Sequence, residues 1–358
     1  MKKLLFAAHS LNLGGIETAL ITLLEELVKK EYEITLVLEK KEGIFLERLN
    51  PKIKLIEYKP SNNKIVPLRK FINLCKQIKF KLKYQNKFDF SASYATYSLS
   101  SGFVSRTASQ NSALWVHVDY LTKNENDEVK TKNYYKQLKC EEFKKIIFVS
   151  KESKENFLKL FPHCKEKAIY CNNLIDGQKI LEKSKEEIPE KRQEIVTFLN
   201  IGRHDEKQKR LSKLIEVAEQ LKKDGLIFKI LFVGEGQDTS MYKQMVENKK
   251  LEDTITFVGQ KKNPYPYYNI SDSVILTSDY EGYPVVFLES MLLKKPIITT
   301  NVSDYEAIEG KYGIVTSKEV SSIYNAMKNF IENGYTIKEQ FDYKKYNEEI
   351  IQNLEKLF

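Results

Sequence analysis

The chain has 358 residues, of which 42% are hydrophobic and 30% are charged. These values are typical of a globular protein with two domains, and no apolar run approaches the ~20 residues of a membrane-spanning helix. The formal net charge of +9 favours an anionic partner, such as a nucleotide phosphate, an acidic lipid or a nucleic acid.

The cysteines and the amino terminus indicate the compartment. The four cysteines (Cys75, Cys140, Cys164 and Cys171) show no Cys-x-x-Cys pair and no metal-ligand spacing. The first apolar run ends at Ala8, which is too short for a secretory signal and typical of a buried strand. We therefore expect reduced thiols and a cytoplasmic protein.

The chain begins with a strand–helix–strand pattern. Residues 4–8 and 34–38 are short apolar runs that predict buried parallel strands, with a helix up to about residue 30 between them. Gly14 and Gly15 lie in the first strand-to-helix turn. Two glycines there either satisfy a tight turn or let the backbone approach a ligand closely.

Residues 64–87 contain eight lysines and arginines and no acidic residue. Apolar residues recur in this segment at helical spacing: Leu68, Phe71, Ile72, Cys75, Ile78 and Leu82. One interpretation is a basic amphipathic helix that binds an anionic membrane surface. The other is a solvated helix that packs its apolar stripe on the first domain. Stacking of Phe71, Phe80 and Tyr84 on single-stranded nucleic acid is a third reading, but no nucleic-acid-binding fold accompanies them, and we expect no such partner.

The middle of the chain supplies a lone histidine and a boundary. Residues 112–120 read as a strand with His117 near its polar end, where a histidine serves either structure or an active site. Residues 183–194 are charged and broken by Pro189, which makes them the best linker candidate. We expect domains at 1–182 and 195–340, followed by an amphipathic helix at 341–358.

The second domain opens with a cation-rich loop between a strand at 195–201 and a helix at 211–222. Arg203, Lys207 and Lys209 lie in this loop, and a strand-to-helix loop rich in cations is suited to a phosphate. Gly234 follows the next strand, at 228–233, in a Gly-x-Gly turn that is a weak signal by itself.

A strand at 273–277 precedes the most informative motif. Glu281 lies in a loop with Gly282, Tyr283 and Pro284, and a helix from Val285 carries Glu289. Because Gly282 and Pro284 interrupt the chain between the two glutamates, we expect both carboxylates to face one crevice above the carboxyl end of the strand. Ligands bind in such crevices of open α/β sheets.

Glu281-Gly-Tyr-Pro followed by Glu289, together with Arg203 and Lys209, resembles the retaining nucleotide-sugar glycosyltransferases of the GT-B fold, family four (glycosyl transferases group 1). The resemblance implies an α/β protein with two Rossmann-like domains facing each other across a cleft. It also implies that the carboxyl-terminal helix crosses back to the amino-terminal, acceptor-side domain, whereas the second domain binds the donor.

The resemblance also implies roles for individual residues. Glu289 would bind the ribose of the nucleotide, and Glu281 would bind the transferred sugar beside the amides of Gly282, Tyr283, Pro284 and Val285 (Pro284 contributing no N–H). Arg203 and Lys209 would hold the diphosphate, with Lys207 as the rival lysine. Gly14, Gly15 and His117 would face the donor from the first domain, and Gly234 would flank the nucleotide. Arg210 departs from the pattern, because the family usually has glycine there.

We therefore predict a retaining, metal-independent glycosyltransferase that needs no cofactor. Fixed cations replace the metal that other such enzymes use, although Asp279 and Glu281 leave a carboxylate metal site open as an alternative. A UDP-sugar is favoured over a GDP-sugar, and the expected acceptor is a saccharide or lipid-linked precursor of a bacterial surface polysaccharide or glycoconjugate. The alternatives are a non-catalytic glycosyltransferase-like binding subunit and a sugar-nucleotide epimerase.

Overall fold

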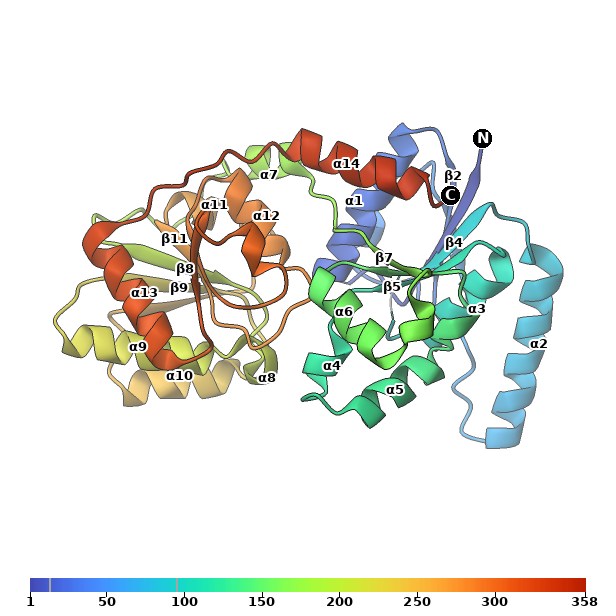
Figure 1. Cartoon of the computed structure of the whole chain (residues 1–358), viewed down its shortest axis with the longest axis horizontal. Coiled ribbons are helices and arrows are strands. Elements are labelled where there is room, and N and C mark those ends of the chain that lie inside the picture. The colour runs from blue at the N-terminus through green and yellow to red at the C-terminus, as the bar shows by residue number, and fades with distance from the viewer. Residues whose placement is uncertain (13, 95) are drawn as a thin grey trace. The chain divides into compact units, whose positions relative to one another are not determined.

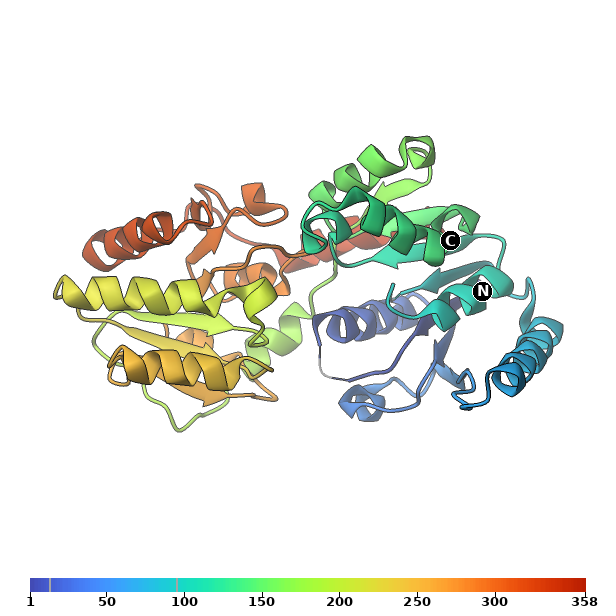
Figure 2. The same ribbon diagram turned by 90° about the horizontal axis from the view of Figure 1, so that it is seen from below.

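A computed structural model describes residues 1–12, 14–94 and 96–358 of the chain. The chain divides into two compact units (Figure 1). Unit 1 comprises residues 1–174 together with 346–358, and unit 2 comprises residues 175–345. Each unit contains a parallel sheet between helices, as Figures 1 and 2 show.

In unit 1 the described residues form a seven-stranded sheet in the order β3-β2-β1-β4-β5-β6-β7. All of its strand pairs are parallel, and the order reverses direction between β1 and β4. The strands are β1 (Lys3–Ala8), β2 (Glu33–Leu38), β3 (Lys54–Glu57), β4 (Phe90–Ser93), β5 (Ser112–Val116), β6 (Lys145–Phe148) and β7 (Ala168–Tyr170). The helices are α1 (Gly15–Lys29), α2 (Val66–Tyr84), α3 (Leu99–Ala108), α4 (Tyr120–Lys123), α5 (Glu128–Gln137) and α6 (Lys151–Leu160).

Unit 2 contains a six-stranded parallel sheet in the order β10-β9-β8-β11-β12-β13, which reverses direction between β8 and β11. The strands are β8 (Thr197–Ile201), β9 (Lys229–Val233), β10 (Ile255–Gly259), β11 (Ser273–Leu276), β12 (Ile297–Thr300) and β13 (Gly313–Thr316). The helices are α7 (Gly177–Lys183), α8 (Glu206–Lys209), α9 (Leu211–Lys223), α10 (Thr239–Asn248), α11 (Pro266–Asn269), α12 (Val285–Leu292) and α13 (Val320–Asn333).

The core of unit 2 lies on both faces of its sheet. Phe198 of β8 packs in a cluster with residues of α9, α10 and α13, whereas its neighbour Leu199 packs with Tyr267 and Tyr268 of α11. Successive strand residues point to opposite faces, so a strand that is buried on both faces reads as a continuous apolar run. This is why β8, β9 and β11 are visible in the sequence.

The last helix, α14 (Tyr343–Glu355), begins in unit 2, and its residues from Tyr346 onward belong to unit 1. Its Ile350, Ile351 and Leu354 are buried, and the ring of Phe358 lies 4.9 Å from that of Phe90. The chain passes from unit 1 to unit 2 at residue 175, ahead of the predicted end of the first domain at residue 182. Residues 183–194 make contacts within unit 2, including an ion pair between Arg192 and Asp272.

Helix α2 forms where the basic segment predicts it, but most of the apolar stripe does not pack on unit 1 in the way that one of the two interpretations required. Leu68, Phe71, Ile78 and Leu82 are exposed, and Phe80 is buried instead. The ring of Phe80 lies 5.2 Å from Tyr58 and 4.9 Å from Tyr84, so Phe80 and Tyr84 pack within unit 1. They cannot join Phe71 in an exposed stacking surface, because Phe71 and Phe80 lie on opposite faces of the helix.

None of the helices in the described part of the chain combines the length and the apolar character that a bilayer crossing requires.

Candidate active site

The candidate site lies at the carboxyl ends of β8 and β11, the two neighbouring strands at which the strand order of unit 2 reverses. The loop after β8 carries Arg203 and continues into α8 with Lys209, and the loop after β11 carries Glu281. Loops on either side of such a reversal separate, and they leave a crevice in which α/β proteins bind ligands. The sheet order thus brings together residues that are about 70 positions apart in the chain.

Glu281 is the centre of the contacts between these loops. Its Oε1 accepts hydrogen bonds from Lys209 Nζ at 2.6 Å and from Ser278 Oγ at 2.7 Å. Its Oε2 accepts one from Gln208 Nε2 at 3.2 Å. The side chains of Lys209 and Glu281 are only 17% and 9% exposed. Both carboxylate oxygens are therefore held in place at the edge of the sheet.

The two loops are also joined through their backbones. The Asp279 N–H donates to the Gln208 carbonyl at 2.8 Å, and Thr277 Oγ1 donates to the Lys209 carbonyl at 2.9 Å. Ser303 Oγ donates to the carbonyl of Glu281 at 2.9 Å. The position of Glu281 is thus fixed by its backbone as well as by its side chain.

Three cations follow β8, namely Arg203, Lys207 and Lys209, and they differ in exposure. Arg203 is 68% exposed, and its nearest polar contacts are 3.4 Å to Gln208 Oε1 and 3.7 Å to Asp205. Lys209 turns inward towards Glu281, and Lys207 is exposed. Arg203 can therefore reach an added anion without breaking a strong ion pair, and Lys209 is already positioned between the loops.

Arg210 adopts a left-handed backbone conformation with φ of 51°. This conformation strains residues that have a Cβ. The strain explains why glycine is usual at this position in the family that the sequence resembles. The guanidinium compensates, because its Nε lies 2.5 Å from Asp279 and its NH1 lies 3.2 Å from Glu206. The departure from the family pattern thus ties the start of α9 to the loop after β11.

The ion pairs of Asp279 compete with the alternative of a metal bound by Asp279 and Glu281. Asp279 also pairs with Lys213 Nζ at 2.6 Å. Burial acts to raise the pKa of Asp279, but the hydrogen bonds from Arg210 and Lys213 outweigh it and hold that pKa below its usual value. A divalent ion between Asp279 and Glu281 would have to displace Arg210, Lys213 and Lys209. Fixed cations therefore suit these residues better than a metal.

The described residues do contain one group with the geometry of metal ligands, in unit 1. Ligand atoms of Glu141, His163 and Cys164 lie within 4.8 Å of one another, a cluster that the cysteine spacing did not predict. Burial raises the pKa of the Cys164 thiol, so its metal-binding thiolate form is disfavoured. Glu141 and His163 already share a hydrogen bond with each other.

The two glycines after β9 are required by packing within the protein. A Cβ on Gly234 would lie 1.9 Å from the carbonyl oxygen of Gly202, and one on Gly236 would lie 2.1 Å from that of His204. The turn at Gly234 thus supports the loop that carries Arg203. A direct contact between Gly234 and a nucleotide stays a prediction.

Glu289 lies in the second turn of α12 and has other partners than Glu281. Its Oε2 accepts a hydrogen bond from Tyr268 OH at 2.7 Å. Burial raises the pKa of the Glu289 carboxyl, although hydrogen bonds from Tyr268 and Tyr265 act in the opposite direction. Each of the two glutamates is therefore held by side chains of unit 2, and a shared crevice for both stays a prediction.

The start of α12 follows the predicted break. Pro284 is the residue before the helix, with the backbone extended, and Val285 is its first residue. Gly282, Tyr283 and Pro284 are buried. The first N–H groups of a helix carry a partial positive charge that favours anions.

The predicted residues of unit 1 lie at the carboxyl ends of β1 and β5. Gly14 precedes α1, and a Cβ on Gly15 would meet nothing within 4 Å. His117 is buried against Tyr94, and its Nε2 has no hydrogen-bond partner in the described part of the chain. Burial lowers the pKa of His117 to about 3, so the ring is neutral at physiological pH. A neutral buried imidazole suits hydrogen bonding better than proton donation.

The sequence did not single out Ser278, Gln208 or the two tyrosines that hold Glu289. Ser278 is a small polar residue in a loop, where such residues are common, and Gln208 is a polar residue of the short helix α8. The run from Tyr265 to Tyr268 was a visible signal, because buried tyrosines need a partner for their hydroxyl groups.

Comparisons with known proteins agree with this architecture. Residues 178–355 match the family model described as Glycosyl transferases group 1. An uncharacterized glycosyltransferase of Methanocaldococcus jannaschii is 26% identical over 191 residues, which are 48% of this chain and 47% of that relative. The chain thus spans about half the length of this relative.

Two further matches cover most of the chain. The N-acetylgalactosamine-N,N'-diacetylbacillosaminyl-diphospho-undecaprenol 4-alpha-N-acetylgalactosaminyltransferase of Campylobacter jejuni is 27% identical over 84% of this chain and 81% of the relative. The crystal structure of Anabaena HepE in complex with UDP and glucose superposes with a TM-score of 0.76 at 18% identity, over 99% of this chain and 100% of HepE. At this identity the likeness establishes a shared fold, which confirms the predicted GT-B class. The chain therefore belongs to the family of group 1 glycosyl transferases, and the matching segment contains every unit 2 residue of the candidate site.

Proposed function

We propose that this protein transfers a sugar from a nucleotide-diphosphate sugar to a saccharide or lipid-linked acceptor, with retention of configuration. The observation that carries the proposal is the pair of cations that follow β8, exposed Arg203 and Lys209, of which Lys209 is held against Glu281 at the reversal of the sheet. Because the chain belongs to a glycosyltransferase family, we interpret these cations as ligands for the diphosphate of a sugar donor.

The proposed chemistry begins with the leaving group. When the glycosidic bond breaks, negative charge develops on the departing diphosphate, and fixed cations in a preorganised site stabilise it. Arg203 offers a forked pair of N–H donors for phosphate oxygens, whereas Lys209 acts as a point charge. The N–H groups at the start of α12 add a partial positive charge.

Glu281 is proposed to accept hydrogen bonds from hydroxyl groups of the transferred sugar. Ser278 and Gln208 fix its carboxylate before any ligand arrives, which lowers the cost of ordering the site. When Lys209 binds the diphosphate, the hydrogen bonds from Ser278 and Gln208 keep Glu281 in place. Glu289 is proposed to bind the ribose, and His117 to contact the sugar as a neutral imidazole.

The donor and acceptor classes are further proposals. A UDP-sugar is favoured because HepE, which shares the fold, was crystallised with UDP and glucose. A lipid-linked acceptor is favoured because the name of the Campylobacter jejuni relative specifies a diphospho-undecaprenol acceptor. Such an acceptor would place the reaction at the inner face of a bacterial membrane, in the synthesis of a surface polysaccharide or glycoconjugate.

The test is a donor screen by thermal shift and by release of free sugar. UDP-, GDP- and ADP-sugars are added to the wild type and to Arg203→Ala, with and without EDTA. We expect one nucleotide class, UDP, to stabilise the wild type, slow release of free sugar from that donor, and no effect of EDTA. The Arg203→Ala variant should lose most of both effects, whereas Lys223→Ala, at the exposed end of α9, is the control and should retain them.

The screen also separates the alternatives. Binding without sugar release or transfer to any saccharide would support a non-catalytic subunit. Conversion of the donor to its epimer would support an epimerase. Absence of binding by every nucleotide sugar, or binding that requires a metal, would contradict the proposed donor site.

A further inference from the structure

Helix α2 presents an apolar surface that unit 1 does not cover. Its inner face is fixed by buried Phe80, by the hydrogen bond of Ser61 N–H to Asn73 Oδ1 at 2.7 Å, and by that of Lys76 Nζ to the Lys59 carbonyl at 2.7 Å. Phe71, Ile78 and Leu82 lie about 160–200° around the helix from Phe80, at ~100° per residue. They therefore form a stripe opposite the face that packs on the protein.

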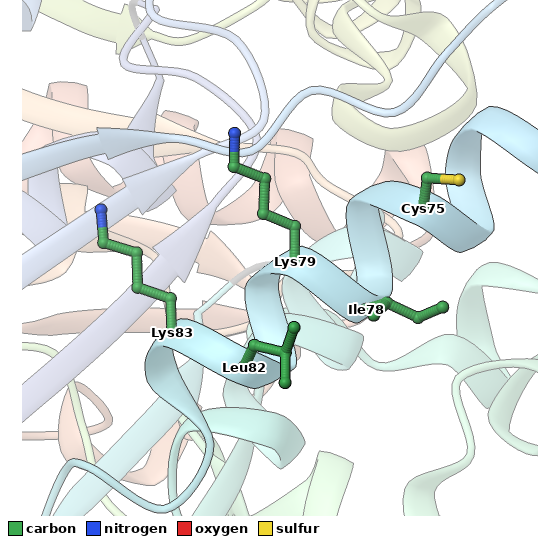
Figure 3. Close-up of a pocket in the computed structure, with 5 residues that line it drawn as sticks. All are labelled: Cys75, Ile78, Lys79, Leu82 and Lys83. Carbon is green, nitrogen blue, oxygen red and sulfur yellow. The ribbon is translucent and has the colours of Figure 1, made fainter.

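This stripe is unusually exposed for residues of its kind. Phe71 is 63% exposed and Leu82 is 81% exposed, and Leu74 and Ile78 are each about half exposed, at 53% and 49%. A shallow hollow on this surface is lined by Cys75, Ile78, Lys79, Leu82 and Lys83 (Figure 3). Large apolar side chains gathered on one face of a helix indicate an interaction surface.

The charges beside the stripe indicate what it contacts. Lys70 and Lys81 lie on one side of the stripe in the helical projection, and Lys79 and Lys83 lie on the other. Figure 3 shows Lys79 and Lys83 extending to the same side of the helix, whereas Ile78 and Leu82 point to another side. Residues 64–87 contain no acidic side chain, so no local carboxylate neutralises these lysines. Figures 1 and 2 both place α2 at the outer edge of unit 1, where a flat surface can reach it.

We propose that the outer face of α2, defined by Phe71, Leu74, Ile78 and Leu82 with the flanking lysines, docks on an anionic membrane surface. An apolar stripe between two rows of lysines matches the boundary between acyl chains and acidic headgroups. The lysines draw the helix to the headgroups, and their long stems let the ammonium groups remain in water while the stripe enters the acyl region. The proposal does not depend on transferase activity.

A nucleic acid would use the same positive charge differently. Stacking on bases requires aromatic rings beside the lysines. On this face Phe71 is the only aromatic residue among the described residues of α2, because Phe80 and Tyr84 pack against unit 1. Aliphatic side chains dominate the stripe, which favours the bilayer.

The first test is sedimentation of the full chain with vesicles of phosphatidylcholine, or of phosphatidylcholine mixed with phosphatidylglycerol, at low and high salt. We expect binding to the anionic vesicles only, weakened by salt because screening reduces the attraction. Replacing Lys79 and Lys81 by Gln should weaken binding about 30-fold, since each cation near such a surface contributes ~1 kcal/mol. The Phe71→Gln, Leu82→Gln variant should lose binding on the order of tenfold or more while retaining the fold, because both side chains are exposed.

A matched control separates the α2 surface from net charge. Lys191 and Lys262 are exposed lysines of unit 2, and replacing both by Gln removes the same total charge as the α2 variant. This control should bind vesicles as the wild type does. Equal loss in the control and in the Lys79, Lys81 variant would overturn the proposal, and so would undiminished binding of the Phe71, Leu82 variant.

The cysteines provide a second measurement. Cys75 is exposed beside the stripe, whereas Cys140, Cys164 and Cys171 are buried. An environment-sensitive fluorophore on Cys75 should shift to shorter wavelength with anionic vesicles and remain unchanged with phosphatidylcholine alone. No shift with anionic vesicles, or tight binding of a single-stranded oligonucleotide in their place, would overturn the membrane assignment.

Discussion

The ion pair between Lys209 and Glu281 gives the sharpest prediction about the candidate site. The Nζ–Oε1 distance is 2.6 Å and both side chains are mostly buried, so removing one partner leaves a charge without its counter-ion. Breaking a fully buried pair costs ~3–5 kcal/mol. Partial exposure and the remaining partners of Glu281 lower the estimate for Lys209→Met to about 2–3 kcal/mol.

Replacing the other partner, Glu281, is expected to cost less stability. In Glu281→Gln the side-chain carbonyl can still accept hydrogen bonds from Ser278 or Gln208, and Lys209 can turn towards solvent. We expect a loss of about 1–2 kcal/mol. The double variant removes both charges, so it should be less destabilised than the sum of the single variants by about 2 kcal/mol.

The assay is urea unfolding of the full chain followed by circular dichroism. The single tryptophan, Trp115, lies in unit 1, so its fluorescence reports that unit separately and serves as an internal reference. A coupling energy near zero would refute the reasoning, because it would mean that the ion pair does not hold the β8 and β11 loops together.

Three further predictions concern single residues. Arg210→Ala and Arg210→Gly both lose the ion pairs with Asp279 and Glu206. Glycine also relieves ~1 kcal/mol or more of left-handed backbone strain, so the Gly variant should have the higher urea midpoint. The opposite order would contradict this account of Arg210. His117 has a folded-state pKa of about 3 against 6.5 for the free group, so the stability it contributes is complete above pH 6.5 and falls by ~1.4 kcal/mol per pH unit below it, down to about pH 3. His117→Asn should flatten this acid limb of the stability curve, and an unchanged slope would refute the assignment. Tyr268→Phe removes a hydrogen bond to the buried Glu289 carboxylate, which raises the pKa of Glu289 further. The destabilisation of about 1–3 kcal/mol should therefore grow as pH rises and Glu289 ionises. A destabilisation that does not change with pH would mean that Glu289 is already neutral and would contradict this prediction.

Much of the fold was predictable because its central strands are buried on both faces. β1, β2, β8, β9 and β11 appear as apolar runs in the sequence. β4 was missed although it lies beside β1 in the sheet, because its residues Phe90–Ser93 form only a short run with two serines. A buried serine at such a site finds a local partner, as Ser91 does with the Ser105 carbonyl at 2.7 Å, and hydropathy does not reveal this.

The candidate site was predictable in its charged residues but not in their supports. Arg203, Lys209, Glu281 and Glu289 follow from the motif, and the sheet order of unit 2 brings the first three to neighbouring loops. How Arg210 is accommodated where the family usually has glycine could not be deduced, because its compensating partner Asp279 is 69 positions away in the chain. The outer stripe of α2 was visible as a pattern, yet only the burial of Phe80 shows which face of the helix is free.

The central claim is that the loop after β8 binds the diphosphate of a nucleotide sugar. The most direct measurement compares the affinities of UDP and UMP by calorimetry, in the wild type, in Arg203→Ala and in the control Lys223→Ala. UMP lacks the second phosphate, so the difference between the two affinities isolates the contacts to that group. Hydrogen bonds to charged groups contribute about 1.5–3 kcal/mol, so we expect UDP to bind the wild type and the control at least about tenfold more tightly than UMP. In Arg203→Ala this preference should largely disappear, and an undiminished preference in that variant would contradict the account.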